Sequence, residues 1–295
     1  MKAPALAYAR PTRLTDVLAQ LEKHGDEARL LAGGQTLLAT LNMRLSEPAL
    51  LIDMQSVAEL KGITMAGNCL HIGAMVTHSE VEASPLVAQH APLLRMAAPH
   101  IAHRAIRNLG TFGGSIGYGD PAAEWPACLL ALDGVVIARS LQGERRIAAQ
   151  EFFTGLYTTA LEANEVIVAC EVPLAAPNQR FEFDELVRRH GDYAVVGLAA
   201  SAQEHEGVLT DVRLAWIGVG STPQRSCATE RALDGLPLNQ DLIAQALQTL
   251  RAELQPEADL THSLAAKQHL AGVLLKRALQ TLSAPHHAGG SAPVA

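Results

Sequence analysis

Hydrophobic and polar positions follow two different periods in the first third of this chain. The leucines and valine of segment 14–21 recur at the i, i+3, i+4, i+7 spacing of an amphipathic helix, which Gly25 would end. Short apolar runs at 29–31, 49–53 and 69–73 predict three buried strands. Because these strands alternate with helical patterns, we expect a mixed arrangement of helices and strands here.

The pattern changes at the proline-rich stretch 173–177, which continues neither period and predicts a domain boundary. Beyond it, segments 180–188, 193–203 and 208–219 predict three antiparallel strands, followed by two amphipathic helices. The last segment, 284–295, is rich in Pro, Gly, Ala and His, and we expect it to be disordered.

Two glycine-bearing segments stand about eighty residues apart, Ala32-Gly33-Gly34-Gln35-Thr36 and Thr111-Phe112-Gly113-Gly114-Ser115. Each combines glycines, whose backbone amides are not covered by a side chain, with a residue that carries a hydroxyl group. This combination is suited to binding an anion. Either Gly-Gly pair alone is more often an ordinary tight turn. Together they predict a clamp for a diphosphate. Neither a P-loop nor a G-x-G-x-x-G fingerprint is present, so an ordinary NTPase or Rossmann site is excluded.

Composition narrows the picture further. With 295 residues, 48% hydrophobic and 18% charged, the chain can bury a large core and form two domains. A net charge of −7 gives no basic surface, so neither nucleic acid nor anionic lipid is an expected partner. No apolar run reaches the roughly 20 residues of a membrane span, and the start lacks a signal-peptide profile. We therefore expect a cytoplasmic protein.

Metal chemistry finds little support in the sequence. The four cysteines lie far apart, without a C-x-x-C pair, so no iron–sulfur or zinc site can be built locally, and we expect reduced, packed thiols. His100 and His103 share a predicted helix without a nearby carboxylate or cysteine, which disfavours a metal site. We predict no metal ligands.

The residues around the two segments resemble a known family. Arg107-Asn108-Leu109-Gly110 before the second segment, and Gly119-Asp120-Pro121-Ala122-Ala123-Glu124 after it, are similar to the second flavin motif of the FAD-binding medium subunit of molybdenum hydroxylases. This group includes carbon monoxide dehydrogenase and xanthine dehydrogenase. The first segment resembles the family's A-G-G-[HQ]-[ST]. The resemblance extends from about Tyr8 to Leu282.

The resemblance implies an α+β fold. An FAD-binding domain of the vanillyl-alcohol oxidase type would occupy residues 1–175, in subdomains of about 1–55 and 56–175. A smaller C-terminal domain of the CO dehydrogenase flavoprotein type, with a three-stranded antiparallel sheet and helices, would occupy 176–283.

The resemblance also assigns cofactor-binding residues. The FAD diphosphate would lie between the two segments, held by their amides and by the side chains of Gln35, Thr36, Thr111 and Ser115. The family pattern places the apolar Ile101 near the cofactor. Asp120 and Glu124 would hold the polar chain of FAD, and Leu161 and Tyr193 would lie at its ring system.

Four of these assignments carry alternatives or departures from the family pattern. Ile101 equally fits ordinary core packing, and Tyr193 also fits a buried strand tyrosine. Glu124 replaces the aspartate that is usual in relatives. Gln35 replaces a histidine found in many relatives, so we expect FAD bound without a covalent link. Where several relatives have a lysine, this chain has Asp184-Glu185.

The function implied by the resemblance is electron transfer. A large partner subunit would carry the molybdopterin cofactor and hydroxylate the substrate, expected to be an aromatic N-heterocycle, with aldehydes and carbon monoxide as alternatives. A small subunit would carry two [2Fe-2S] clusters, and this chain would pass their electrons through FAD to a terminal acceptor, within a dimer of heterotrimers. No side chain of this chain would need to act as a catalytic acid, base or nucleophile in this step. Two alternatives are a stand-alone FAD-dependent oxidoreductase of the same fold and a scaffold that has lost its flavin.

Overall fold

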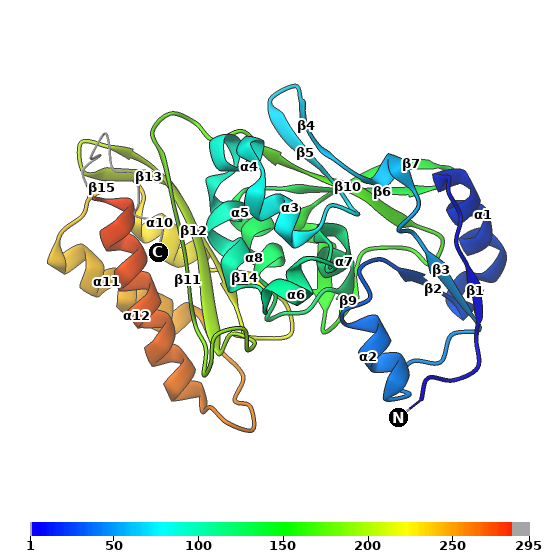
Figure 1. The fold of residues 1–295 in the computed structure, drawn as a ribbon. Helices are drawn as coiled ribbons and strands as arrows, with labels where there is room; N and C mark the ends of the chain where they lie inside the picture. The colour runs from blue at the N-terminus through cyan, green and yellow to red at the C-terminus, as the bar shows by residue number, and fades with distance from the viewer. Residues whose placement is uncertain (1, 285–295) are drawn as a thin grey trace.

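A computed structural model describes residues 2–284, which form three units side by side along one long axis (Figure 1). Apart from Ala284, the segment predicted to be disordered lies outside these residues. Within residues 2–284, no helix is both long enough and apolar enough to cross a membrane. The mixed α+β fold with an antiparallel C-terminal sheet is confirmed.

The N-terminal unit is a small parallel sheet with strand order β1-β3-β2. Its elements are β1 (Ala7–Ala9), α1 (Leu14–His24), η1 (Gly25–Glu27), β2 (Ala28–Leu31), α2 (Leu37–Asn42), β3 (Leu50–Asp53) and η2 (Ala58–Leu60). Helix α1 buries the four apolar residues that predicted it and ends at Gly25, which has a positive φ of 48°. The expected strand-to-helix connection between β2 and α2 contains the first glycine segment.

The middle unit is a five-stranded antiparallel sheet, β4-β5-β10-β6-β7, with a group of short helices. Its elements up to α6 are β4 (Ile63–Ala66), β5 (Cys69–Gly73), α3 (His78–Ala83), α4 (Pro85–His90), α5 (Pro92–Ala97), η3 (Ala98–His100) and α6 (Arg104–Arg107). The rest are α7 (Phe112–Tyr118), α8 (Glu124–Ala131), β6 (Val135–Ser140), β7 (Gly143–Ala148), α9 (Ala149–Phe152), β8 (Phe153–Gly155), β9 (Thr158–Thr159) and β10 (Val166–Pro173). The second glycine segment opens α7.

The C-terminal unit contains the three predicted antiparallel strands and the two predicted helices, with one further helix and two short strands. Its elements are β11 (Gln179–Leu186), β12 (Val196–His205), β13 (Val208–Ile217), β14 (Gln224–Arg225), α10 (Cys227–Leu233), β15 (Leu236–Pro237), α11 (Gln240–Glu253) and α12 (Leu264–Leu282). Strands β14 and β15 each add two residues beside β13. Tyr193 precedes β12 and lies in the loop after β11.

Each of two sheets contributes side chains to two hydrophobic cores, and this holds the three units in place relative to one another. Val166 of β10 packs in the N-terminal core, whereas Ile167 and Cys170 pack in the middle core. In the C-terminal sheet, Leu198 faces its own helices while Ala199 packs against the middle unit. Because neighbouring strand residues point to opposite faces, each of these strands joins two units through continuous apolar contact.

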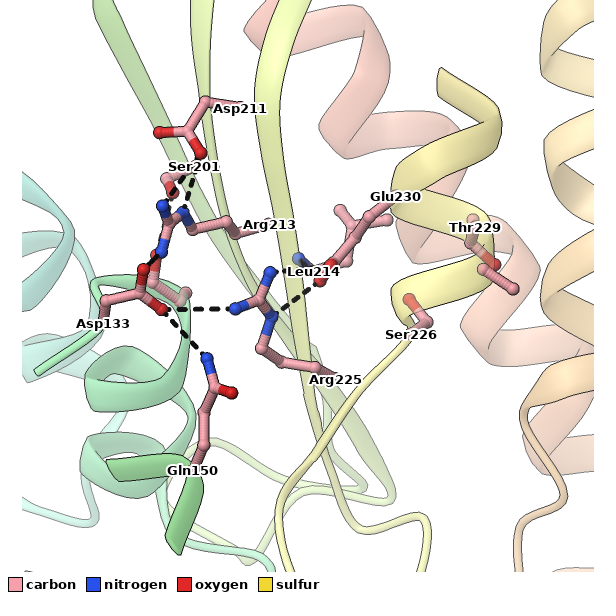
Figure 2. A network of polar contacts seen from close by, with 12 residues as sticks. Asp133, Gln150, Ser201, Asp211, Arg213, Leu214, Arg225, Ser226, Thr229 and Glu230 are labelled. Atoms are coloured by element: carbon pink, nitrogen blue, oxygen red, sulfur yellow. Dashed lines mark hydrogen bonds and ion pairs between the residues drawn. The ribbon is translucent and has the colours of Figure 1, made fainter. Parts of the chain in front are cut away.

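A polar network crosses the boundary between the middle and C-terminal units (Figure 2). Asp133, in the turn after α8, forms ion pairs with Arg213 of β13 and Arg225 of β14. Arg225 also forms a two-pronged pair with the buried Glu230, with distances of 3.0 and 2.7 Å. The Ser201 hydroxyl donates to the carbonyl oxygen of Ala131 at 2.9 Å. These bonds set the orientation of α8 against the C-terminal sheet.

A buried histidine lies behind the second glycine segment. The Trp125 Nε1–H donates to His78 Nδ1 at 2.9 Å, so this ring nitrogen is unprotonated. The His78 amide donates to the carbonyl oxygen of Gly110. Burial, with a smaller contribution from the charge of Arg107, lowers the pKa of His78 to about 4. His78 therefore links α8, through its neutral imidazole, to the turn that precedes Thr111, through its backbone amide.

The boundary network can be tested with two matched aspartates. Asp133 and Asp211 both contact Arg213 and both have positive φ, 48° and 51°, which asparagine also tolerates. Only Asp133 crosses the boundary. We expect Asp133→Asn to lower the free energy of unfolding by about 2 kcal/mol and Asp211→Asn by less than about 0.5 kcal/mol, as measured in urea. Equal losses would contradict a special role for the boundary.

The buried histidine predicts a pH dependence of stability. Its pKa of about 4 in the folded chain lies below the unfolded value of 6.5, so between these values the unfolded state binds more protons. Acidification through this window should cost roughly 3 kcal/mol through His78 alone. His78→Asn keeps an acceptor for Trp125 and should remove this slope, whereas His269→Asn on the exposed side of α12 should retain it. Parallel slopes in both variants would exclude His78 as the source.

Candidate functional site

The first glycine segment forms a turn with unused backbone donors. Residues 32–36 connect β2 to α2, and Gly34 has a φ of 73°, which favours glycine. Within residues 2–284, no acceptor takes a hydrogen bond from the amides of Gly33, Gly34, Gln35 and Thr36. The Thr36 hydroxyl is not used to cap α2. These four consecutive donors are half-exposed and can therefore donate to water or to an anion.

The second glycine segment differs from this expectation, because it is the first turn of α7. Thr111 caps the helix, and its Oγ1 accepts from the Gly114 amide at 3.1 Å. The amides of Phe112 and Gly113 donate to Val76 and Ala74. The Ser115 amide donates to the Thr111 carbonyl oxygen, as in an ordinary helix.

The expectation that both segments offer free amides therefore holds for the first one only. In the second segment, the Thr111 amide and the Ser115 hydroxyl have no acceptor or donor among residues 2–284. Gly113 and Gly114 serve a different purpose: Gly113 lets Ala74 approach α7, and Gly114 makes room for the Thr111 hydroxyl and for Cβ of Ala32.

The two segments touch, although eighty residues separate them. A methyl group added at Gly33 would lie 2.1 Å from the carbonyl oxygen of Leu109 and 2.7 Å from Cα of Gly110. One added at Gly114 would lie 3.3 Å from Cβ of Ala32. The structure thus brings together the two halves of the predicted clamp, and Gly33 is required for that contact.

Two carboxyl groups lie just beyond α7. Asp120 is buried, its Oδ1 accepts from the Ala122 amide at 2.9 Å, and burial raises its pKa. Glu124 is the first residue of α8; burial, the charge of Glu185 and that of Asp120 together raise its pKa to about 8. Both groups can therefore carry a proton more readily than ordinary carboxyls.

Three tyrosines gather near these carboxyls. Tyr193 is 68% exposed, so the alternative of a buried strand tyrosine is wrong. Its phenol is within electrostatic reach of Asp120, Glu124, Tyr118 and Tyr157.

The rings of Tyr118 and Tyr157 lie 5.1 Å apart, with Tyr157 at a positive φ of 52°. Sequence reasoning missed both tyrosines, although Tyr118 directly precedes Gly119-Asp120 in the second motif. Tyr157 gave no sequence signal, since only the fold brings it beside Tyr118. An exposed aromatic surface next to two carboxyls suits a planar, partly polar ligand.

The remaining predicted residues lie in the middle unit. Ile101 is buried in its core, in agreement with the packing alternative, and its carbonyl oxygen accepts from Arg107 Nη1 at 3.1 Å. Leu161 is half-buried against the same core, between β9 and β10. Arg107 also bonds the carbonyl oxygens of Pro99 and Ala102, so it fixes the turn that presents Ile101.

One expectation about the histidines is wrong. His100 and His103 do not share a helix, because η3 ends at His100 and His103 precedes α6. His100 also has a carboxylate neighbour, since its Nδ1 lies 3.5 Å from Oε1 of Glu185. No group of three or more possible metal ligands gathers among the described residues.

The site therefore has a place for an anion beside a place for a ring. The free amides lie at the contact between the N-terminal and middle units, and the tyrosines and carboxyls follow along α7 toward the C-terminal unit. These features fit FAD, which joins a diphosphate to a planar isoalloxazine, better than they fit a free phosphate.

Comparison with known proteins agrees with this geometry. Residues 4–175 match the family model of the FAD binding domain in molybdopterin dehydrogenase, and residues 181–282 match the CO dehydrogenase flavoprotein C-terminal domain. The chain is 36% identical, over 279 residues, to the nicotine 6-hydroxylase medium subunit of Paenarthrobacter nicotinovorans. That match covers 95% of this chain and 98% of the relative.

Two solved structures share the fold. One is carbon monoxide dehydrogenase from Hydrogenophaga pseudoflava, with a TM-score of 0.93, 35% identity, and coverage of 96% of this chain and 98% of that chain. The other is quinoline 2-oxidoreductase from Pseudomonas putida 86, with a TM-score of 0.91 and the same identity and coverage. This protein belongs to the family of FAD-binding medium subunits of molybdenum hydroxylases.

Proposed function

We propose that this chain carries FAD within a three-part enzyme and passes electrons from the [2Fe-2S] clusters of a small subunit to a terminal acceptor. A large subunit with the molybdopterin cofactor would hydroxylate the substrate. The observation that carries the proposal is the row of four free amides, Gly33 to Thr36, at the contact between the two glycine segments. Membership of the medium-subunit family supports it.

Each site residue has a distinct task in this proposal. The diphosphate would face the amides of segment 32–36 and the side chains of Gln35 and Thr36. The Thr111 amide and the Ser115 hydroxyl would approach from the other segment, where Gly113 and Gly114 allow the close packing of α7 against Ala74 and Ala32. The Thr111 side chain is already used by the Gly114 amide, so it would shape the turn rather than bind FAD.

The rest of the site would surround the polar chain and the ring. Asp120 and Glu124 would hold hydroxyl groups of the polar chain, and Tyr193 would cover the isoalloxazine. Ile101 and Leu161 would supply apolar surface nearby. Bound FAD supplies the capacity to store two electrons, and the protein contributes position, polarity and exclusion of water.

The substrate class and the assembly form a second part of the proposal. Relatives are named for nicotine and quinoline, which are both aromatic N-heterocycles. We extend that class to the large subunit that would accompany this chain. A dimer of heterotrimers in the cytoplasm is the expected assembly.

The stand-alone oxidoreductase is the alternative of the same fold. It would need groups that grip or deprotonate a substrate above the flavin. The tyrosines and carboxyls near Tyr193 are the only such groups that the described part of the site offers, and burial favours their protonated forms. This electrostatic character favours the electron-transfer role.

A glycine pair with matched φ tests the amide site. Gly34 and Gly207 have φ values of 73° and 81°, but only Gly34 belongs to the first segment. Alanine at either position should cost about 1–2 kcal/mol of stability. Gly34→Ala should also weaken FAD binding at least about tenfold, because relief of the strain moves the amides. The measurement is an FAD titration of the refolded apo chain; similar FAD affinities in the two variants would refute the amide site.

Purification from the native host tests the assembly. Flavin and iron–sulfur absorption with two co-purifying polypeptides is the expected result. A single yellow polypeptide that oxidises substrate unaided would establish the alternative.

A further inference from the structure

Gly218, at the end of β13, lies against the backbone next to Tyr193. Its φ of 75° is in the left-handed region that favours glycine. A methyl group added there would lie 2.5 Å from the carbonyl oxygen of Val195 and 3.0 Å from that of Ala194. Ala194 directly follows Tyr193, and it packs in the middle core. Gly218 is therefore the residue that lets the segment after Tyr193 lie close to the end of β13.

The same glycine also holds the turn that carries Asp120. The Gly218 amide donates to the carbonyl oxygen of Pro121 at 3.0 Å. Within this turn, Oδ1 of Asp120 accepts from the Ala122 amide at 2.9 Å. The turn is thus closed internally by the Asp120 side chain and held from outside by Gly218. Contacts of this one residue consequently join the Asp120 turn to the loop of Tyr193.

A buried lysine binds the carbonyl group of Gly218. Lys267 extends from the first turn of α12, and its Nζ donates to the Gly218 carbonyl oxygen at 3.0 Å. Only 9% of the Lys267 side chain is exposed, and its Nζ lies 2.9 Å from Oδ2 of Asp259. A buried ammonium is costly unless it is paired and hydrogen-bonded, and these two acceptors meet that need. Bonds to both its amide and its carbonyl oxygen therefore fix the backbone of a residue that is otherwise free to adopt many conformations.

A surface loop in turn orients the lysine. Oδ2 of Asp259 pairs with Lys267, while Oδ1 accepts from the amides of Thr261 and His262 at 2.7 and 2.8 Å. The Asp259 amide donates back to the carbonyl oxygen of His262 at 3.0 Å. One carboxylate therefore closes the loop with one oxygen and holds the buried ammonium with the other. Hydrogen bonds to ionised groups are stronger than neutral ones, so this loop anchors Lys267 firmly.

We infer that Lys267 is a positioning residue for the flavin site, which it reaches through Gly218. Asp259 holds Lys267 in place for this task. This inference rests on the proposed function, in which Asp120 would hold the polar chain of FAD and Tyr193 would cover the ring. When the ammonium is removed, Gly218 loses one of the two hydrogen bonds that fix it. The loop of Tyr193 can then move relative to the Asp120 turn, although Lys267 itself lies outside the set of residues assigned to FAD.

The positioning can be measured without FAD. The chain has four tyrosines, so fluorotyrosine labelling gives four ¹⁹F signals, which single tyrosine-to-phenylalanine variants assign. In the full apo chain, Lys267→Met should shift the Tyr193 signal and leave that of Tyr8, in the N-terminal unit, in place. Arg277→Met is the matched control, because Arg277 is another cation of α12 that pairs with Asp184, and it should leave both signals unchanged. An unmoved Tyr193 signal in Lys267→Met would overturn the inference.

A glycine pair tests the backbone contact itself. Gly218 and Gly235 have φ values of 75° and 74°, but a methyl group at Gly235 would meet no atom within 4 Å. Alanine at either position carries similar backbone strain, so only Gly218→Ala should also move the Tyr193 signal. The same ¹⁹F result in both variants would contradict the contact. If Lys267→Met fails to fold, Asp259→Asn takes its place. It keeps an oxygen for the loop but loses the ion pair, and it should move the Tyr193 signal; an unmoved signal there would also count against the inference.

The effect on the cofactor is measured with FAD bound. Lys267→Met should raise the dissociation constant of FAD at least about threefold and shift the flavin absorption bands, whereas Arg277→Met should change neither. Unchanged FAD affinity and absorption in Lys267→Met would overturn its role in the flavin site. Failure of the wild type to bind FAD would instead refute the proposed function, while the ¹⁹F signals of the apo chain would still report whether Lys267 positions the loop of Tyr193.

Discussion

The close approach of Gly33 to the backbone of Leu109 and Gly110 is the constraint on which the site depends. Any Cβ at Gly33 would overlap the Leu109 carbonyl oxygen, so the N-terminal and middle units can meet in this way only at a glycine. This contact leaves the neighbouring amides without partners, whereas the second segment uses most of its amides internally. The two similar glycine motifs thus differ in structure: the first leaves four amides without an acceptor among residues 2–284, and the second uses most of its amides inside the protein.

The boundary between the middle and C-terminal units also depends on close contact. Small residues of β12 and β13, Ala199 and Ala215, let α8 lie against the sheet, and Asp133 closes the contact through two arginines. Because α8 begins at Glu124, this packing also decides which groups surround that carboxyl. The orientation of the C-terminal sheet and the electrostatic surroundings of Glu124 are therefore coupled.

Strand geometry explains why the neighbouring acidic residues at 184 and 185 have different surroundings. Asp184 and Glu185 are neighbours, so β11 sends them to opposite faces. Asp184 reaches Arg277 of α12, while Glu185 enters the boundary beside His100. A sequence reading can note that both residues are acidic, but it cannot tell which of the two carboxyls is buried.

The sequence by itself determined the family, the two glycine motifs and elements such as the apolar face of α1 and the three C-terminal strands. These features depend on periodicity and on local backbone conformation, which neighbouring residues decide. Only the tertiary structure decided which amides are free, that Tyr157 joins Tyr118, and that His100 meets Glu185. These facts depend on contacts between residues far apart in the chain, and neither spacing nor composition encodes such contacts. Long-range packing therefore decided the chemistry of a site whose location the sequence already indicated.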